Sequence, residues 1–161
     1  MTRQPHAAEQ DGIDFGLDTD NWLRAYRKSV RSHPSIESAL TYFKRIFDDA
    51  PAPFVITNLS LVVTDANHAA QRMLRRSLLN LREKPLFMIV AREDRVGLRS
   101  IASELLAEEK GITRPIRVQP VRGKPLDLVV SACVCRDHRG VPECVFWIFL
   151  HPIDNGTEDL L

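Results

Sequence analysis

The apolar residues between positions 18 and 32 recur at helical spacing. Trp22, Tyr26 and Val30 follow one another at intervals of four residues, so they lie on one side of a predicted helix. The polar segment in front of them, residues 1–17, shows no such period, and we interpret it as a disordered tail.

A second amphipathic helix is predicted after Ser35, which can cap it. The pair His33-Pro34 separates the two helices, because a residue before proline avoids the helical region. We interpret residues 18–50 as one helical extension. Its apolar side must be buried, either on the sheet of its own domain or against a second copy of the chain. The candidate residues for a dimer interface are Trp22, Leu23, Tyr26, Val30, Ile36, Leu40, Phe43 and Phe47.

The remaining pattern mixes strands and helices over residues 51–152. Asn67 is a good N-cap for one helix, and residues 92–109 carry the apolar period of another. This order predicts an α+β fold in which antiparallel strands pack with one face against the helices. Residues 153–161 are predicted as an acidic tail. The β-rich runs are 54–57, 61–64, 112–120, 124–136 and 141–151.

Composition narrows the classes of function. The 161 residues suit one domain, and 22 basic against 21 acidic residues leave a net charge of +1, so we expect no nucleic-acid partner. No run of 18 apolar residues exists, so we expect no membrane span and a cytoplasmic protein. Between His68 and Lys124 the chain has thirteen basic and six acidic residues. This basic excess either attracts an acidic partner or forms an ordinary solvent-exposed face. No nucleophile, base and acid occur at motif spacing, so we expect no enzyme.

Residues 45–152 resemble a PAS domain. The segment from Ala66 to Ala70, Ala-Asn-His-Ala-Ala, is similar to the family's entry into its first helix. The stretch from Lys84 to Arg95 is similar to the family's middle helices and to the lead into its long connecting helix. The turn from Asp137 to Gly140 and the strand of Trp147 resemble the final hairpin. The resemblance implies a five-stranded antiparallel sheet with helices on one face, preceded here by the N-terminal helices.

Two segments depart from the family pattern. The turn Asn58-Leu59-Ser60-Leu61 lacks the usual glycine, which favours a wider turn. The sequence His151-Pro152-Ile153-Asp154 replaces the usual Asp-Ile-Thr, and we expect a stand-alone module whose output is contact with another chain.

The resemblance implies signal transduction, since PAS domains sense small molecules or light, or serve in dimerisation and docking. We expect a regulatory module that forms a homodimer and binds a signalling protein whose identity the sequence does not give. The alternative is a sensor that binds a small apolar ligand between sheet and helices.

The resemblance also bears on cofactors. A light-sensing flavin domain carries a reactive cysteine after the second strand, whereas the cysteines here lie on the last two strands. Many haem-binding members use a histidine on the long connecting helix, and residues 92–109 contain none. Flavin and haem are therefore disfavoured, and we predict no cofactor and no metal.

The three cysteines are candidates for redox chemistry. If Asp137 to Gly140 is the whole turn, Cys133 lies opposite Cys144, with Cys135 diagonal on the same face. Three thiols on one face suit a redox bridge or a metal site, but a metal site would be short of one ligand, and cysteine is also a common small core residue.

Strand alternation and helix faces give candidates for a ligand pocket, although a slip of one residue reverses every choice on a strand. A lining so apolar would take a hydrophobic ligand, and a filled core is the competing interpretation. The candidates are Val55, Met73, Leu86, Met88, Ile101, Leu105, Val130, Ala132, Phe146 and Ile148.

Overall fold

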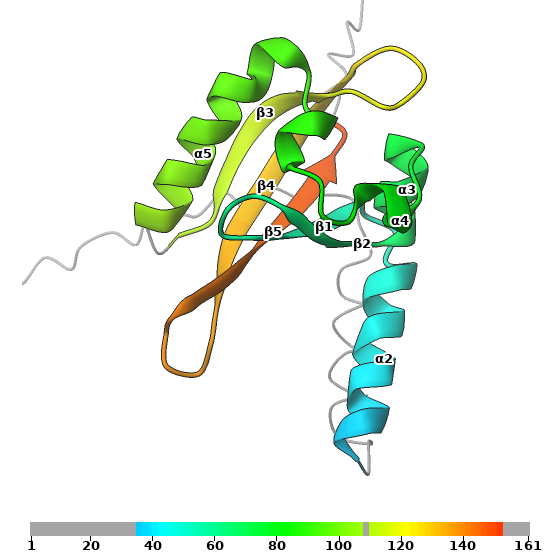
Figure 1. Ribbon diagram of the computed structural model, residues 1–161, viewed down its shortest axis with the longest axis vertical. Coiled ribbons are helices and arrows are strands. Elements are labelled where there is room, and N and C mark those ends of the chain that lie inside the picture. The colour runs from blue at the N-terminus through cyan, green and yellow to red at the C-terminus, as the bar shows by residue number, and fades with distance from the viewer. Residues whose placement is uncertain (1–34, 108–109, 153–161) are drawn as a thin grey trace, which may run out of the picture.

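A five-stranded antiparallel sheet forms the centre of the molecule, as predicted (Figure 1). The computed structural model describes residues 35–107 and 110–152. The strand order is β2-β1-β5-β4-β3, which puts the last strand of the chain in the middle of the sheet. The strands are β1 (Phe54–Asn58), β2 (Val63–Ala66), β3 (Ile112–Val118), β4 (Leu126–Arg136) and β5 (Pro142–Leu150).

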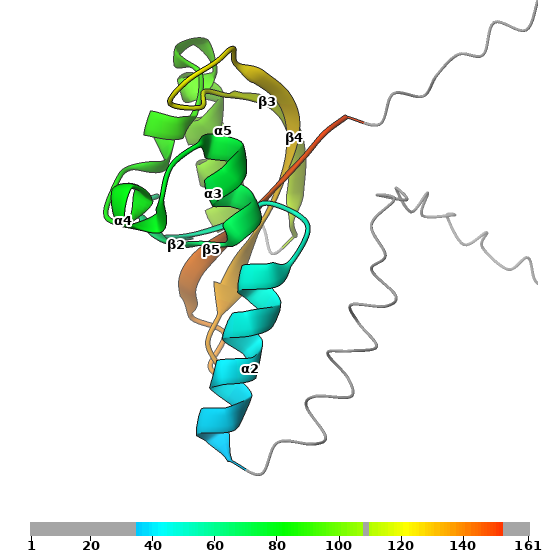
Figure 2. The same ribbon diagram turned by 90° about the vertical axis from the view of Figure 1, so that its right-hand side faces the viewer.

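The helices after β2 cover one face of this sheet, while α2 runs away from it as an arm (Figure 2). The C-terminal end of α2 contacts α3. No helix in the described part of the chain is both long and apolar enough to span a bilayer. The helices are α2 (Ile36–Asp49), α3 (His68–Leu74), α4 (Leu78–Leu81), the 3-10 turns η1 (Leu86–Ile89) and η2 (Arg92–Asp94), and α5 (Arg95–Ala107).

The hydrophobic core lies between the sheet and α3, α4 and α5. Trp147 at the middle of β5 is fully buried, and its indole Nε1 donates a hydrogen bond to Thr57 Oγ1 at 3.0 Å. This bond satisfies the polar atom of each side chain, so neither residue carries the cost of an unpaired buried group.

The inward side of β5 corrects one sequence prediction. Val145, Trp147 and Phe149 face the core, so Phe146 and Ile148 lie on the opposite, outer face of the sheet. The run from residue 144 to 150 is apolar at every position, and alternation therefore could not show which side faces the helices.

The hairpin between β4 and β5 corrects a second prediction. Arg136 pairs with Pro142, so the connection is one residue longer than expected, and an irregularity beside Cys135 shifts the register further. Cys135 therefore lies opposite Cys144, and Cys133 lies opposite Phe146. Asp137 shapes this wider turn, because its Oδ1 accepts hydrogen bonds from two backbone N–H groups within it.

The turn between β1 and β2 is not widened by its missing glycine, contrary to the expectation, because Leu61 N donates to Asn58 O at 3.0 Å and closes a four-residue turn. Asn58 Oδ1 accepts hydrogen bonds from the backbone N–H groups of Ser60 and Val62. Leu61 takes the left-handed conformation, with φ of 59°, where the family usually has glycine.

The β3 edge of the sheet is closed to further strands. Pro115 lacks the N–H that a pairing strand would need. Further along, the Arg117 backbone N–H donates to Asp94 Oδ2 at 2.7 Å, and its guanidinium contacts both oxygens of the same carboxylate. The Arg117 side chain holds the pKa of the Asp94 carboxyl below its usual value through these hydrogen bonds.

Candidate functional site

Three aromatic rings join α2 to the outer face of the sheet. Phe47 lies 6.3 Å from Phe54 and 6.2 Å from Phe146 between ring centroids, and the two sheet residues are 5.8 Å apart. Edge-to-face packing of this kind is favourable beyond the area it buries. Lys44 reinforces the contact, because it pairs with Asp48 on its own helix at 2.7 Å and with Asp65 on β2 at 3.3 Å.

A buried asparagine fixes the point where α2 enters the domain. Asn67 Oδ1 accepts hydrogen bonds from Ala70 N at 3.0 Å and from Phe54 N at 2.9 Å. Its Nδ2 donates to Ala52 O at 2.8 Å and to Ala50 O at 3.4 Å. One side chain thus caps α3, as predicted, and also ties the end of α2 to the start of β1.

The predicted dimer-interface residues fall in three places. Phe47 packs on the sheet, whereas Leu40 is 65% exposed and Phe43 is 37% exposed on the part of α2 that extends away. Ile36 begins α2. The remaining candidates, Trp22, Leu23, Tyr26 and Val30, lie outside the described residues.

The outer sheet face is apolar beyond the contact with Phe47. We use this name for ten uncharged outward positions of the three central strands, most of which are half-buried; the charged outward residue Asp127, near the start of β4, lies outside this set. The alternation of strand side chains assigns them to one side. They are Phe54 and Ile56 on β1, Val129, Ser131, Cys133 and Cys135 on β4, and Cys144, Phe146, Ile148 and Leu150 on β5.

The three cysteines share this outer face, as predicted, although in the corrected register. Burial raises the pKa of the Cys135 thiol to about 11, with Cys144 adding to the effect. Burial also raises the pKa of Cys133, which lies nearest to Cys135 on the same strand. Thiolate is the reactive form of cysteine, so both thiols are poor nucleophiles at neutral pH. Redox activity stays a prediction, and within the described ranges no group of three His, Cys, Asp or Glu residues could hold a metal ion.

The predicted pocket residues do not line one cavity. Phe146 and Ile148 face outward, and Met88 is 39% exposed. Ile101 and Met73 line two different surface pockets. A bound apolar ligand stays a prediction. The other candidates belong to the packed core: Val55, Leu86, Leu105, Val130 and Ala132.

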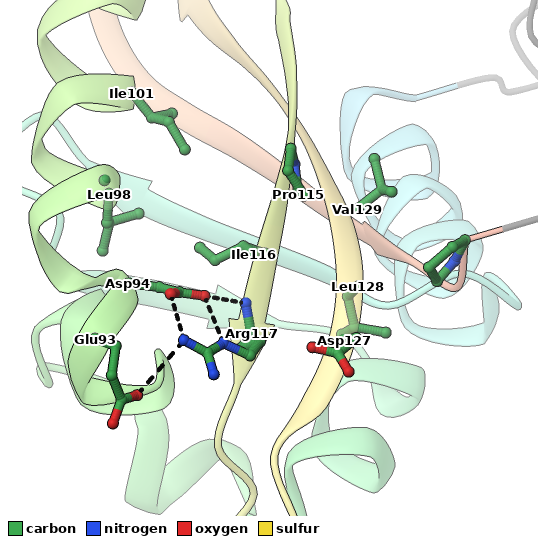
Figure 3. Close-up of a pocket in the computed structure, with 12 residues that line it drawn as sticks. Glu93, Asp94, Leu98, Ile101, Pro115, Ile116, Arg117, Asp127, Leu128 and Val129 are labelled. Atoms are coloured by element: carbon green, nitrogen blue, oxygen red, sulfur yellow. Dashed lines mark hydrogen bonds and ion pairs between the residues drawn. The ribbon is translucent and has the colours of Figure 1, made fainter.

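The larger of those two surface pockets, about 560 Å³, lies around the β3 edge (Figure 3). Leu98 and Ile101 of α5 form one side of it, and Pro115 lies on the facing strand. Figure 3 shows Arg117 directed at Asp94 and Glu93, with the nearer ion pair at 3.0 Å. Arg117, the one cation among the described residues that line this pocket, is therefore already neutralised by acidic neighbours.

The smaller pocket, about 400 Å³, has the opposite electrostatic character. It lies where the end of α3 meets the β3–β4 hairpin and the end of β5, and its lining in the described chain contains no acidic residue. Residue spacing gave no sign of it beyond the basic excess, because its parts are far apart in the sequence. The basic lining residues are Arg72, Arg75, Arg122, Lys124 and His151, and the others are Met73, Pro120, Gly123 and Leu126.

The fold is similar to that of PAS domains in solved structures. A PAS domain from Colwellia psychrerythraea superimposes with a TM-score of 0.65 at 16% identity, over 70% of this chain and 96% of that one. The PAS domain of an HTR-like protein from Haloarcula marismortui gives 0.62 at 10% identity, over 77% and 97%. The PAS domain of nitrogen regulation protein NR(II) from Vibrio parahaemolyticus gives 0.55 at 17% identity, over 67% and 95%. A comparison with curated proteins returned no match.

The sequence itself carries the family assignment. The model of the PAS fold family matches residues 41–153, well over half of the chain. The chain therefore belongs to the PAS family. PAS domains are typically sensory or regulatory modules of signalling proteins rather than catalysts.

Proposed function

We propose that this PAS domain is a regulatory module that forms a homodimer through α2 and the outer sheet face, and that the dimer contacts a signalling protein. The observation that supports the dimer is the uncharged outer sheet face. Among the described helices, α2 covers part of this face, where Phe47 contacts Phe54 and Phe146. Uncharged, half-buried side chains over three adjacent strands are typical of a surface that another protein covers.

A second copy of the chain suits this surface because it carries the same one. A two-fold axis would place the two outer sheet faces together, and each copy would bury apolar area of the other. The exposed part of α2 continues the same apolar surface, since Phe47 already lies on the sheet and Leu40 is two helical turns before it. The arm would then lie across the partner copy.

The test uses the full chain with one substitution on the arm. Leu40→Glu places a charge in the proposed interface, and because Leu40 is largely exposed the fold of a single copy should be unaffected. We expect the wild-type chain to sediment as a dimer at micromolar concentration. We expect Leu40→Glu to raise the dimer dissociation constant at least tenfold, about 1.4 kcal/mol.

The matched control is Val96→Glu. Val96 is 76% exposed on α5, which packs against the other face of the sheet, so this variant adds the same charge away from the interface. Its sedimentation should equal that of the wild type. A monomeric wild-type chain, or equal weakening by both variants, would contradict the proposal.

A further inference from the structure

We propose that the pocket at the end of α3 binds the phosphate groups of a small di- or triphosphate, either free polyphosphate or an organic ester. This goes beyond dimerisation, because it gives the domain a ligand on the surface away from the outer sheet face. The pocket of about 400 Å³ falls in the size range of small-molecule sites.

Charge is the first reason. Arg72, Arg75, Arg122 and Lys124 come from two elements of the fold and line one hollow. Arg76, next to Arg75, has a buried Nε without a hydrogen-bond partner among the described residues. Two other arginines of the described chain are neutralised, Arg114 by Glu104 at 3.1 Å and Arg117 by Asp94 at 3.0 Å.

The four cationic side chains of the pocket form no hydrogen bond or ion pair with any described residue. Their charge of four matches the three or four negative charges of a di- or triphosphate at neutral pH. Guanidinium groups also match the geometry of phosphate oxygens, with which they form paired hydrogen bonds.

Preorganisation is the second reason. The β3–β4 hairpin is attached to α3, because Val121 N donates to Leu74 O at 3.2 Å (Figure 1). Gln119 Nε2 closes the hairpin by donating to Pro120 O at 3.0 Å and to Gly123 O at 3.2 Å. Gly123 has a φ of 111°, and a Cβ placed there would lie 3.8 Å from Arg75 Nη1. The backbone that carries the cations is therefore fixed before any ligand arrives, which lowers the entropy cost of binding.

The remaining lining favours a small molecule over nucleic acid. Met73, Pro120 and Leu126 give an apolar floor, against which the organic part of an ester can pack. Among the described residues that line the pocket there is no Phe, Tyr or Trp on which successive bases could stack. The full chain has a net charge of only +1, so the positive charge is local.

The test is calorimetric titration of the full chain with pyrophosphate, with adenosine diphosphate and with adenosine. We expect both phosphates to bind and adenosine not to bind. Tighter binding of adenosine diphosphate than of pyrophosphate would identify an organic ester as the ligand, and equal binding would identify the polyphosphate group alone. Both results support the proposal, whereas absence of heat from both phosphates would overturn it.

Paired variants separate this site from general surface charge. The double variant Arg75→Gln and Arg122→Gln should weaken pyrophosphate binding at least tenfold. The control double variant, Arg99→Gln and Arg139→Gln, removes the same charge from α5 and from the β4–β5 turn. That turn lies at the opposite end of β4 from the pocket (Figure 1). The control should stay within twofold of the wild type, and equal weakening by both pairs would overturn the site.

Discussion

Asn67 gives the sharpest test of how the N-terminal arm is joined to the PAS core. The substitution Asn67→Ala removes all four hydrogen bonds of a side chain that is fully buried. Phe54 N and Ala52 O would then be left without that partner, at a site where Ala52 is buried and Phe54 is half-buried. Ala70 N would lose its cap.

The magnitude follows from those three backbone groups. Loss of an N-cap costs about 1 kcal/mol. Each buried backbone group left unpaired costs about 1 kcal/mol or more. We therefore expect Asn67→Ala to lower the free energy of unfolding by about 3 kcal/mol, a large share of the roughly 5–15 kcal/mol that holds a typical domain. For a chain of this size this corresponds to a melting temperature lower by about 6–12 °C.

Urea denaturation followed by circular dichroism measures this difference. The control is Asn80→Ala on α4, where the side chain is exposed, and its stability should lie within about 0.5 kcal/mol of the wild type. Amide exchange should also quicken at Phe54 and Ala70 in the Asn67 variant. A loss below 1 kcal/mol would refute the idea that this residue joins the arm to the sheet.

Asn67→Asp separates the two halves of the same side chain. It keeps the oxygen that accepts from Phe54 and Ala70 but replaces the donor that faces the carbonyls of Ala50 and Ala52. The buried site and the two facing carbonyls disfavour a carboxylate, whereas the two N–H donors favour it, and we expect the first effect to dominate and to raise the pKa of the new group in the folded state. Stability should therefore be nearest the wild type below about pH 4 and fall as the pH rises. Equal deficits at pH 4 and pH 7 would contradict this account.

Two further predictions concern groups whose pKa is shifted. The pKa of Asp94 is lowered by Arg117, so its stabilising effect is present above the ordinary pKa of aspartate and is lost as the pH falls through the folded value. In the Asp94→Asn variant the free energy of unfolding should therefore fall less between neutral and acidic pH than it does in the wild type. An unchanged dependence on pH would exclude the Asp94–Arg117 pair as a cause of the loss at acidic pH. Directly opposed cysteines on antiparallel strands lie within the Cα range of a disulfide. Excess oxidised glutathione should therefore link Cys135 to Cys144 slowly, faster at alkaline pH, as the raised pKa of Cys135 requires. Peptide mapping that instead found Cys133 linked to Cys144 would show that the register is wrong.

Local sequence signals predicted much of the fold correctly. Ser35 and Asn67 cap α2 and α3 as their residue types suggested, because an N-cap depends on neighbours three residues away. The five β-rich runs all became strands, although their ends shifted by a few residues. The family resemblance was confirmed by the family model over residues 41–153 and by the similar solved structures.

Residue type did not decide the orientation of β5. Both sides of this strand are apolar, so its own residues do not show which side faces the core, and the pairing with its neighbours in the sheet decides it. The prediction treated the β4–β5 turn as four residues, and the actual connection placed Cys135 instead of Cys133 opposite Cys144. This shift of two residues leaves each side chain on the same face, so the wrong side for Phe146 came from the uniform apolar pattern of β5 and not from the turn.

The sequence alone determined the elements of this protein and the family to which it belongs, because caps, turns and hydrophobic periods act over a few residues. The tertiary structure decided which residues come together in the pockets and at the junction between α2 and the sheet. The basic pocket joins residues near 72, 122 and 151, and Asn67 reaches carbonyls fifteen and seventeen positions earlier. Such contacts join chain segments that come together only when the whole domain folds. A local sequence pattern spans a few residues and therefore cannot predict them.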